Sequence, residues 1–161
     1  MSHSIVINIA EQSLCVFSLN HLVKKYRVAT AKNGPGETSG SEKTPRGKHV
    51  IRAKIGEKEP VNTVFIGRRP TGEIYRAELK KQHPNRDWIL TRILWLSGQE
   101  KGKNRLGNVD TMRRYVYIHG CPDEDPMGIP SSHGCVKMRN SDVIELFNLV
   151  PVLTPVEIIE A

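Results

Sequence analysis

The feature that most constrains this 161-residue chain is a series of short segments in which apolar and polar residues alternate. Ile5, Ile7 and Ile9 alternate in the first segment, and Leu14 and Val16 continue the pattern in the second. A period of two residues indicates strands with one buried face. The 13 glycines and 10 prolines provide turns between such segments and argue against a helical bundle. We therefore predict a mainly β fold of the sandwich or barrel-like type.

The rest of the chain can be divided on the same grounds. Further strands are expected at residues 22–31, 47–55, 61–67, 88–96, 113–118 and 156–159. Two stretches lack a periodic pattern: residues 76–87, which we expect to be irregular, and the polar, glycine-rich loop from Lys32 to Gly47. A loop of this length inside a compact domain is usually functional or mobile.

One helix is expected after residue 139. Its apolar residues fall on a single helical face, at Val143, Leu146, Phe147 and Val150. Asn140 or Ser141 is the expected N-cap, because these side chains accept bonds from free backbone N–H groups. Pro151 is expected to end the helix.

Length and composition limit the class of protein. The chain has the size of one domain, so we assign residues 1–161 to a single domain. No apolar run approaches the roughly 18 residues of a membrane span, so membrane insertion is not expected. No secretory signal is seen before Ile5, and three cysteines are too few for a disulfide scaffold. These features favour a cytoplasmic location, with a periplasmic one as the alternative if a natural leader precedes Met1.

The chemistry of the chain is expected between residues 117 and 140, where two His-Gly-Cys triplets lie on either side of a loop rich in proline and glycine. In one reading, Cys135 is a nucleophile and His119 its base, because a free thiol with a pKa of about 8.5 needs a base at neutral pH. The backbone N–H groups of Gly134 and Cys135 would then bind an oxyanion.

The triplets have two other possible interpretations. His119, Cys121, His133 and Cys135 form an acceptable zinc ligand set, and a zinc-stabilised binding module would follow. Structural zinc sites usually separate paired ligands by two to four residues, however, and here one residue separates them. Alternatively the cysteines are ordinary packed side chains, as Cys15 and Cys121 are expected to be.

The motifs resemble those of the L,D-transpeptidase catalytic domain family (YkuD type). The central resemblance is His119-Gly120 followed, after the proline- and glycine-rich spacer, by Ser132-His133-Gly134-Cys135. The opening segments, the stretch Thr44-Pro45-Arg46-Gly47 and the expected helix also resemble the family, so the likeness covers nearly the whole chain.

This resemblance implies a set of residue roles. Cys135 would be the nucleophile, His119 the general base and acid, and the Gly120 carbonyl the group that orients the imidazole. His133 and Gly134 would shape the oxyanion pocket, and Ser132 would support its loop. The family often has Arg or Asn two positions after the cysteine, where this chain has Lys137. Lys137 and Arg139 are the candidates for contacts with substrate anions. Tyr117 is a further candidate for substrate contact.

The resemblance also implies a reaction on peptidoglycan stem peptides. The thiolate would attack the diaminopimelate carbonyl and release the terminal D-Ala, leaving a thioester and using no cofactor or metal. Because no export signal is seen, we expect water as the acceptor, which describes a cytosolic L,D-carboxypeptidase of muropeptide recycling. The alternative is an L,D-transpeptidase that forms 3→3 cross-links or exchanges D-amino acids.

Partners follow from the same resemblance and from the charge. Carbapenem-type β-lactams are expected to be covalent inhibitors. The net charge of +7 suits a ligand with several carboxylates. Basic residues are not interleaved with aromatic ones as in RNA-binding sheets, so nucleic acid is not an expected partner.

Overall fold

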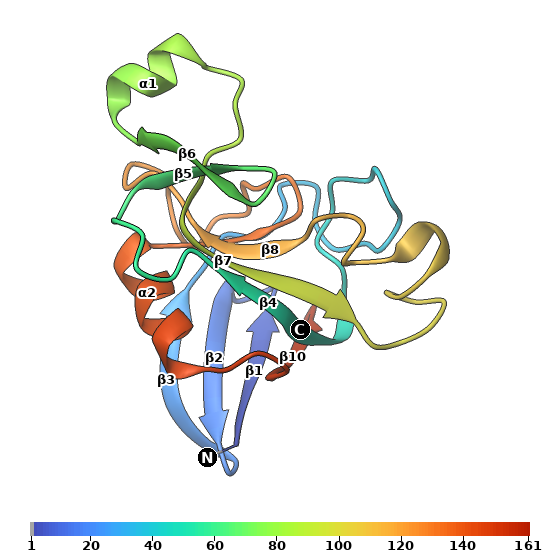
Figure 1. The fold of residues 1–161 in the computed structure, drawn as a ribbon. Helices are drawn as coiled ribbons and strands as arrows, with labels where there is room; N and C mark the ends of the chain where they lie inside the picture. Colours follow the sequence, from blue (N-terminus) through green and yellow to red (C-terminus); the bar gives the residue numbers. More distant parts are fainter. Residues whose placement is uncertain (1) are drawn as a thin grey trace.

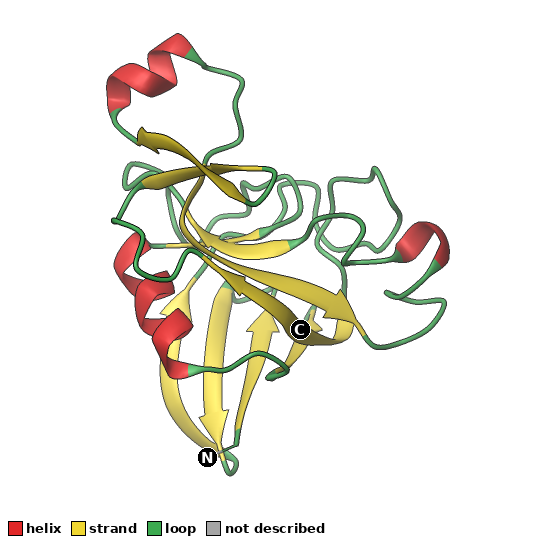
Figure 2. Ribbon diagram, in the orientation of Figure 1, coloured by secondary structure: helices red, strands yellow, loops and turns green. Residues whose placement is uncertain are grey.

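A single mixed sheet organises the chain, as seen in a computed structural model that describes residues 2–161. Its strands are β1 (His3–Asn8), β2 (Ser13–Ser18), β3 (His21–Arg27), β4 (Gly47–Ile55), β5 (Thr63–Ile66), β6 (Arg69–Ile74), β7 (Ile89–Gly98), β8 (Tyr117–Gly120), β9 (Val136–Met138) and β10 (Pro155–Ile159). The helices are α1 (Ala77–Gln82), α2 (Asn140–Leu149) and the short 3-10 helix η1 (Gly107–Val109). The prediction of a mainly β fold is confirmed (Figure 2).

The strand order joins the two ends of the chain to the middle. The main path runs β3-β2-β1-β10-β4-β7-β5-β6, and β8 branches from β7 and pairs with β9. β1 lies parallel to β10, with Ile5 opposite Val156, so the first and last strands meet in the sheet. β7 pairs with β4, β5 and β8, and it carries the branch on which the candidate site is built (Figure 1).

The main core lies between β1, β2 and β3, the branch formed by β8 and β9, and α2. One face of β8 and β9 points into it, through Ile118, Val136 and Met138, which are all fully buried. Val143 and Leu146 of α2 pack against the same cluster. Because strand side chains alternate, Tyr117, His119 and Lys137 must lie on the opposite face of β8 and β9.

The start of α2 corrects the expected cap. The helix begins at Asn140 with Arg139 in the N-cap position, and no side chain caps it. Asn140 is buried, and its side-chain amide bonds instead to the Thr91 hydroxyl and to the Cys121 carbonyl, directly after β8. The helix ends at Leu149, two residues before Pro151, in agreement with the prediction.

The strands β5 and β6, the helix α1 and the loop that follows it as far as Trp88 form an arm at the end of the molecule opposite the N-terminus (Figure 1). Residues 76–87, expected to be irregular, contain α1, which has no buried residue. The arm has a small core of its own made of Val64, Tyr75, Trp88 and Leu90, against which Leu79 of α1 packs. Because Leu79 is the one side chain of α1 that packs on this core, the sequence of α1 has no amphipathic pattern, and the helix was not predicted.

The long loop from Lys32 to Gly47 is held by polar contacts at several points. Arg46 pairs with Glu37 at 2.8 Å between Nε and Oε2. Arg114 donates to the carbonyl of Lys43 at 2.6 Å and to that of Gly36 at 3.3 Å. Within residues 2–161, no helix combines the length and the apolar character that crossing a membrane requires.

Candidate active site

His119 lies on the third position of β8, opposite Ile93 of β7. Its side chain is 1% exposed, and its Nδ1 lies 2.6 Å from the Gly120 carbonyl oxygen. A carbonyl can only accept, so Nδ1 carries the proton and donates it to this bond. The other ring nitrogen, Nε2, is therefore the basic one in the neutral imidazole.

Cys135 comes directly before β9 and shares the face of His119. The parallel register sets His119 opposite Lys137, and Cys135 precedes Lys137 by two residues, so the alternation places its side chain on the same face. The Tyr117 N–H donates to Sγ at 3.2 Å, and the thiol donates to the Tyr115 carbonyl at 3.6 Å. The fold thus brings the expected nucleophile and base to one surface.

The electrostatics of the pair favour neutral partners in the resting enzyme. Burial raises the pKa of the Cys135 thiol to about 12, and the Asp87 carboxylate adds to this, while the Tyr117 N–H and Arg114 oppose it. Burial also lowers the pKa of His119, against the opposing effect of Asp87 and the bond to Gly120. A neutral thiol and a neutral imidazole on the same face are suited to proton transfer during attack rather than to a preformed ion pair.

The loop before Cys135 is fixed by hydrogen bonds to its own backbone and to Thr44. The Ser132 hydroxyl donates to the Cys135 carbonyl and accepts from the Gly134 N–H at 3.2 Å. The buried Thr44 hydroxyl donates to the Gly134 carbonyl at 2.9 Å. Gly134 has φ +131°, a conformation that side chains strongly disfavour, so this position of the loop needs glycine.

A buried polar network supports the strand end that carries His119 and Gly120. Asn140 donates from Nδ2 to the Cys121 carbonyl at 2.9 Å, and it accepts at Oδ1 from the Thr91 hydroxyl at 2.6 Å. A Cβ on Gly120 would come within 2.3 Å of Asn140 Oδ1 and 2.7 Å of the Leu90 carbonyl oxygen. Gly120 is therefore required by close packing, whereas Gly134 is required by backbone conformation.

The zinc ligand set is not assembled. Across the part of the chain that the structure describes, no three His, Cys, Asp or Glu side chains come together as a metal site would require. Cys121 is fully buried with Ala29 and Met127, and its thiol donates to the Met138 carbonyl at 3.4 Å. This agrees with the expectation that Cys121 is a packed side chain.

Two depressions lie on either side of His133. The first, of about 280 Å³, contains Cys135 and Gly134 together with Arg114 and Tyr115. The second, of about 130 Å³, contains Lys137 and Ser132 from the expected site. His133 lines both, and its side chain is 64% exposed.

The remaining expected site residues are already engaged in contacts. Lys137 is 8% exposed, and its Nζ pairs with Asp125 at 3.1 Å. Arg139 donates to the carbonyls of Asp123 and Asp125, at 2.6 and 3.0 Å. The Tyr117 hydroxyl accepts from Arg68 at 3.0 Å.

Sequence reasoning missed several residues at this site. Arg114 anchors the long loop beside Cys135, and Asp87 acts electrostatically on both His119 and Cys135. Arg68 stacks at 4.7 Å over the rings of Trp95 and Tyr115, and Trp95 packs in the same cluster as Cys135. These residues come from segments far apart in the sequence, and none lies in a motif that would have marked it.

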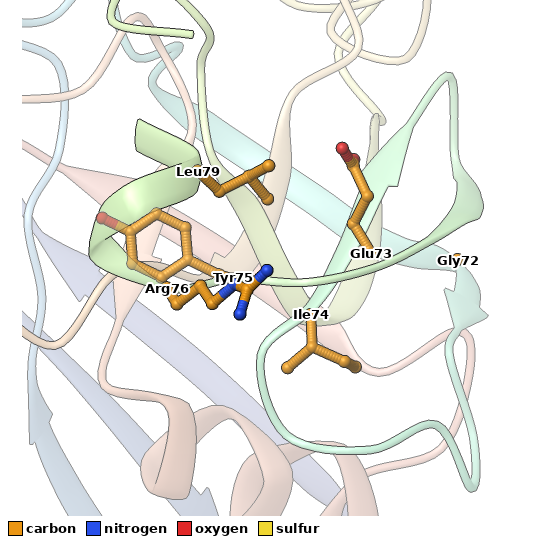
Figure 3. Close-up of a pocket in the computed structure, with 6 residues that line it drawn as sticks. All are labelled: Gly72, Glu73, Ile74, Tyr75, Arg76 and Leu79. Carbon is orange, nitrogen blue, oxygen red and sulfur yellow. The ribbon is translucent and has the colours of Figure 1, made fainter. Parts of the chain in front are cut away.

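A larger depression, of about 530 Å³, is elsewhere. It is lined only by the arm, through residues 72–76 and Leu79 (Figure 3). The close-up shows Tyr75, Arg76 and Leu79 around it, and no nucleophile or base of the candidate site. Its volume therefore does not identify it as the catalytic depression.

Comparison with known proteins agrees with this geometry. The family model described as YkuD, L,D-transpeptidase catalytic domain, matches residues 2–158. No curated protein matches the chain.

Solved structures share the fold. An L,D-transpeptidase from Mycobacterium smegmatis is 18% identical, with a TM-score of 0.58 and coverage of 98% of this chain and 58% of that one. L,D-transpeptidase 3 from Mycobacterium tuberculosis, in complex with a faropenem-derived adduct, is 15% identical, with a TM-score of 0.61 and coverage of 99% and 60%. An L,D-transpeptidase in complex with imipenem is 17% identical, with a TM-score of 0.59 and coverage of 98% and 59%. The chain thus spans about three fifths of the length of these proteins.

Proposed function

The chain belongs to the family of L,D-transpeptidase catalytic domains, and we propose that it catalyses cysteine-dependent acyl transfer on the tetrapeptide stems of peptidoglycan. The bond broken is the one between diaminopimelate and the terminal D-Ala. The observation that carries the proposal is the shared face of β8 and β9, which bears both Cys135 and the imidazole of His119, whose orientation is fixed by its bond to the Gly120 carbonyl.

The first half-reaction follows from the proton positions. His119 Nε2 takes the thiol proton while Sγ forms a bond to the diaminopimelate carbonyl carbon. The tetrahedral intermediate then expels the D-Ala nitrogen, which takes the proton from the imidazolium. A thioester on Cys135 and free D-Ala result. The Gly120 carbonyl holds the imidazole orientation throughout and stabilises its charged form.

The oxyanion needs a donor close to Sγ. The Gly134 N–H donates to the Ser132 hydroxyl at 3.2 Å. The Cys135 N–H makes no hydrogen bond to any other described residue. We propose that this N–H donates a hydrogen bond to the developing oxyanion and so stabilises its negative charge. His133 lines the same depression.

The second half-reaction depends on the acceptor. With water, His119 takes a proton from the water while the oxygen adds to the thioester carbonyl carbon. The tetrahedral intermediate then expels the Cys135 sulfur, which takes the proton from the imidazolium and becomes a thiol again. The product is a tripeptide stem. We propose this hydrolysis, an L,D-carboxypeptidase activity on soluble muropeptides in the cytosol, as the favoured physiological reaction.

L,D-transpeptidation is the second candidate, and the two depressions on either side of His133 favour it. One depression contains the nucleophile, and the other leaves space for a second ligand close to the thioester. An amine that attacks from there would give a 3→3 cross-link or an exchanged D-amino acid.

Mass spectrometry of the products separates the acceptors. Tetrapeptide muropeptide is incubated with the enzyme and an excess of a different D-amino acid. We expect tripeptide as the main product. Exchange of D-Ala for the added amino acid, or dimer formation, would identify an amine-accepting transpeptidase instead. If neither occurs, acyl transfer on these stems is contradicted.

Two further parts of the proposal have separate tests. Carbapenems are expected to acylate Cys135, because imipenem is bound by one of the similar structures. Intact-mass measurement would show an adduct of one inhibitor per chain. The cytoplasmic location is tested by fractionating the cells in which the protein naturally occurs, and recovery outside the cytoplasmic membrane would contradict it.

A further inference from the structure

The smaller depression beside His133 combines both signs of charge. It has a volume of about 130 Å³, and the lining side chains used below are Lys80, Asp87, Trp88, Ser131, His133 and Lys137. We call it the mixed-charge depression. His133 also lines the depression that contains Cys135, and Lys137 is the β9 neighbour of His119. A group bound here is therefore close to the reacting thiol.

Two of its charges have no strong internal partner. The Asp87 side chain is 47% exposed, and its only ionic contact among the described residues is with His133 Nδ1 at 3.6 Å, which is an ion pair only when His133 is protonated. Lys80 forms no ion pair with any other residue in the range 2–161. By contrast, Lys137 is paired with Asp125 at 3.1 Å. One carboxylate and one ammonium are thus available to a ligand.

The arm holds Lys80 in place although α1 itself is exposed. The Tyr75 and Trp88 rings meet edge to face at 5.0 Å, and the Tyr75 hydroxyl donates to Glu124 in the loop after β8. Leu79, the neighbour of Lys80, packs on the same cluster. The ammonium is therefore carried on an element docked to the site rather than on a free loop.

Two buried polar atoms on the lining side chains lack a partner. Trp88 Nε1 and Ser131 Oγ are shielded from solvent and make no hydrogen bond to another described residue. Trp88 as a whole is 6% exposed. Buried donors without a partner are uncommon in folded proteins, and such groups often point to a ligand or an ordered water.

We propose that the mixed-charge depression binds the head group of an α-amino acid, with the ammonium beside Asp87 and the carboxylate beside Lys80. Trp88 and Ser131 supply further donors to the carboxylate. The inference rests on the proposed function, in which two ligands carry this head group: the side chain of diaminopimelate in the donor stem, and a free D-amino acid that acts as acceptor.

The site electrostatics support an ammonium at this place. The Asp87 charge raises the pKa values of both Cys135 and His119. A cation beside Asp87 would offset the part of this effect that opposes thiolate formation. Binding of the correct head group would in this way favour attack by Cys135.

The first arm of the test varies the donor. Tetrapeptide stems with meso-diaminopimelate are compared with stems that have L-lysine at the same position, which retain an ammonium but lack the side-chain carboxylate. If the donor occupies the depression, Lys80→Met raises KM about tenfold for the diaminopimelate stem and leaves KM for the lysine stem unchanged. Asp87→Asn raises KM for both stems.

The second arm varies the acceptor. With the lysine stem held at saturation, the concentration of a free D-amino acid is varied and its incorporation is measured. If the acceptor occupies the depression, Lys80→Met and Asp87→Asn each raise the KM for the amino acid by about tenfold. Either pattern supports the proposal and identifies which ligand binds.

Matched controls come from α1. Lys81→Met and Glu78→Gln change exposed charges of the same helix that do not line the depression, and we expect unchanged KM values in both arms. Acylation by a carbapenem, which lacks the diaminopimelate side chain, checks that each variant retains a folded and reactive thiol. Equal effects of Lys80→Met and Lys81→Met, or no effect of either, would overturn the proposal.

A separate measurement keeps the inference testable if the wild type turns over no stem. Calorimetric binding of free meso-diaminopimelate is then measured on Cys135→Ala, with and without Lys80→Met. Loss of binding through Lys80→Met supports the depression as an amino-acid site, while the absence of turnover contradicts only the proposed function. Binding that does not depend on Lys80, or no binding at all, contradicts the inference.

Discussion

The two His-Gly-Cys triplets have the same three residues in the same order, yet the fold uses them in opposite ways. In the first triplet His119 and Cys121 are almost fully buried. In the second, the His133 side chain is 64% exposed and Cys135 lines an open depression. The active site that we propose thus combines the histidine of one triplet with the cysteine of the other. The comparison teaches that a motif supplies reactive groups, whereas packing decides which of them meet.

The largest expected difference between the triplets is at the two cysteines. Cys135→Ala should abolish D-Ala release and the carbapenem adduct, because it removes the only thiol on the face of His119 within the described residues. Cys121→Ala should retain both and lower the free energy of unfolding by about 1 kcal/mol, since it removes one buried atom. Intact-mass spectrometry and turnover assays measure these outcomes. Loss of both activities in a well-folded Cys121→Ala would contradict our assignment.

The histidines should differ by the next largest amount. His119→Ala removes the general base and should lower kcat/KM by about 10²–10⁴-fold. His133→Ala removes an exposed side chain at the rim and should cost at least ten times less than His119→Ala. Steady-state kinetics on the tetrapeptide stem give both values. Equal losses would mean that His133 takes part directly in proton transfer.

The glycines should differ in kind as well as in size. Gly120→Ala forces a Cβ against Asn140 and the Leu90 carbonyl, and we expect a loss of about 2–3 kcal/mol in unfolding free energy. At Gly134 the nearest atom to an added Cβ is the Lys43 carbonyl oxygen at 3.4 Å, an ordinary contact, so only the backbone conformation resists the change. We expect about 1–2 kcal/mol there. Urea denaturation measures both, and a larger cost at Gly134 would reverse the proposed physical causes.

The smallest effect expected is a shift of the pH profile. The pKa of His119 is lowered, so its imidazole stays neutral and able to accept a proton below pH 6.5. The acidic limb of kcat/KM should therefore lie below pH 6.5, and activity should fall only as the pH drops through the lowered pKa. An acidic limb above pH 6.5 would contradict this.

The thiols provide the matching control for the pH argument. Burial raises the pKa of both Cys121 and Cys135 to about 12. Iodoacetamide labelling of these two cysteines, measured separately from that of Cys15 by peptide mass spectrometry, should therefore be slow at pH 8 and increase with pH. Because the two pKa values are alike, faster labelling of Cys135 would reflect its access to solvent and its neighbouring base.

Much of the fold could be predicted from the sequence because strands with one buried face show a simple alternation. Ile5, Ile7 and Leu14 are fully buried or nearly so, as the alternation required. The helix over residues 140–149 was found from its apolar face. The expected cap at Asn140 or Ser141 was wrong, because Arg139 occupies the N-cap position and no side chain caps the helix. The Asn140 side chain instead bonds to Thr91 and to the Cys121 carbonyl.

By itself, the sequence determined the mainly β class, the position of the late helix and the residue types that carry the chemistry. These depend on local period and on motifs, which neighbouring residues define. Only the tertiary structure decided that His119 and Cys135 share a face, that Asp87 and Arg114 act on the charge of the thiol, and that Lys80 of the arm lines the same depression as His133. The reason is physical: burial and Coulomb interactions depend on distances between segments, and these distances exist only after the sheet and the arm have packed.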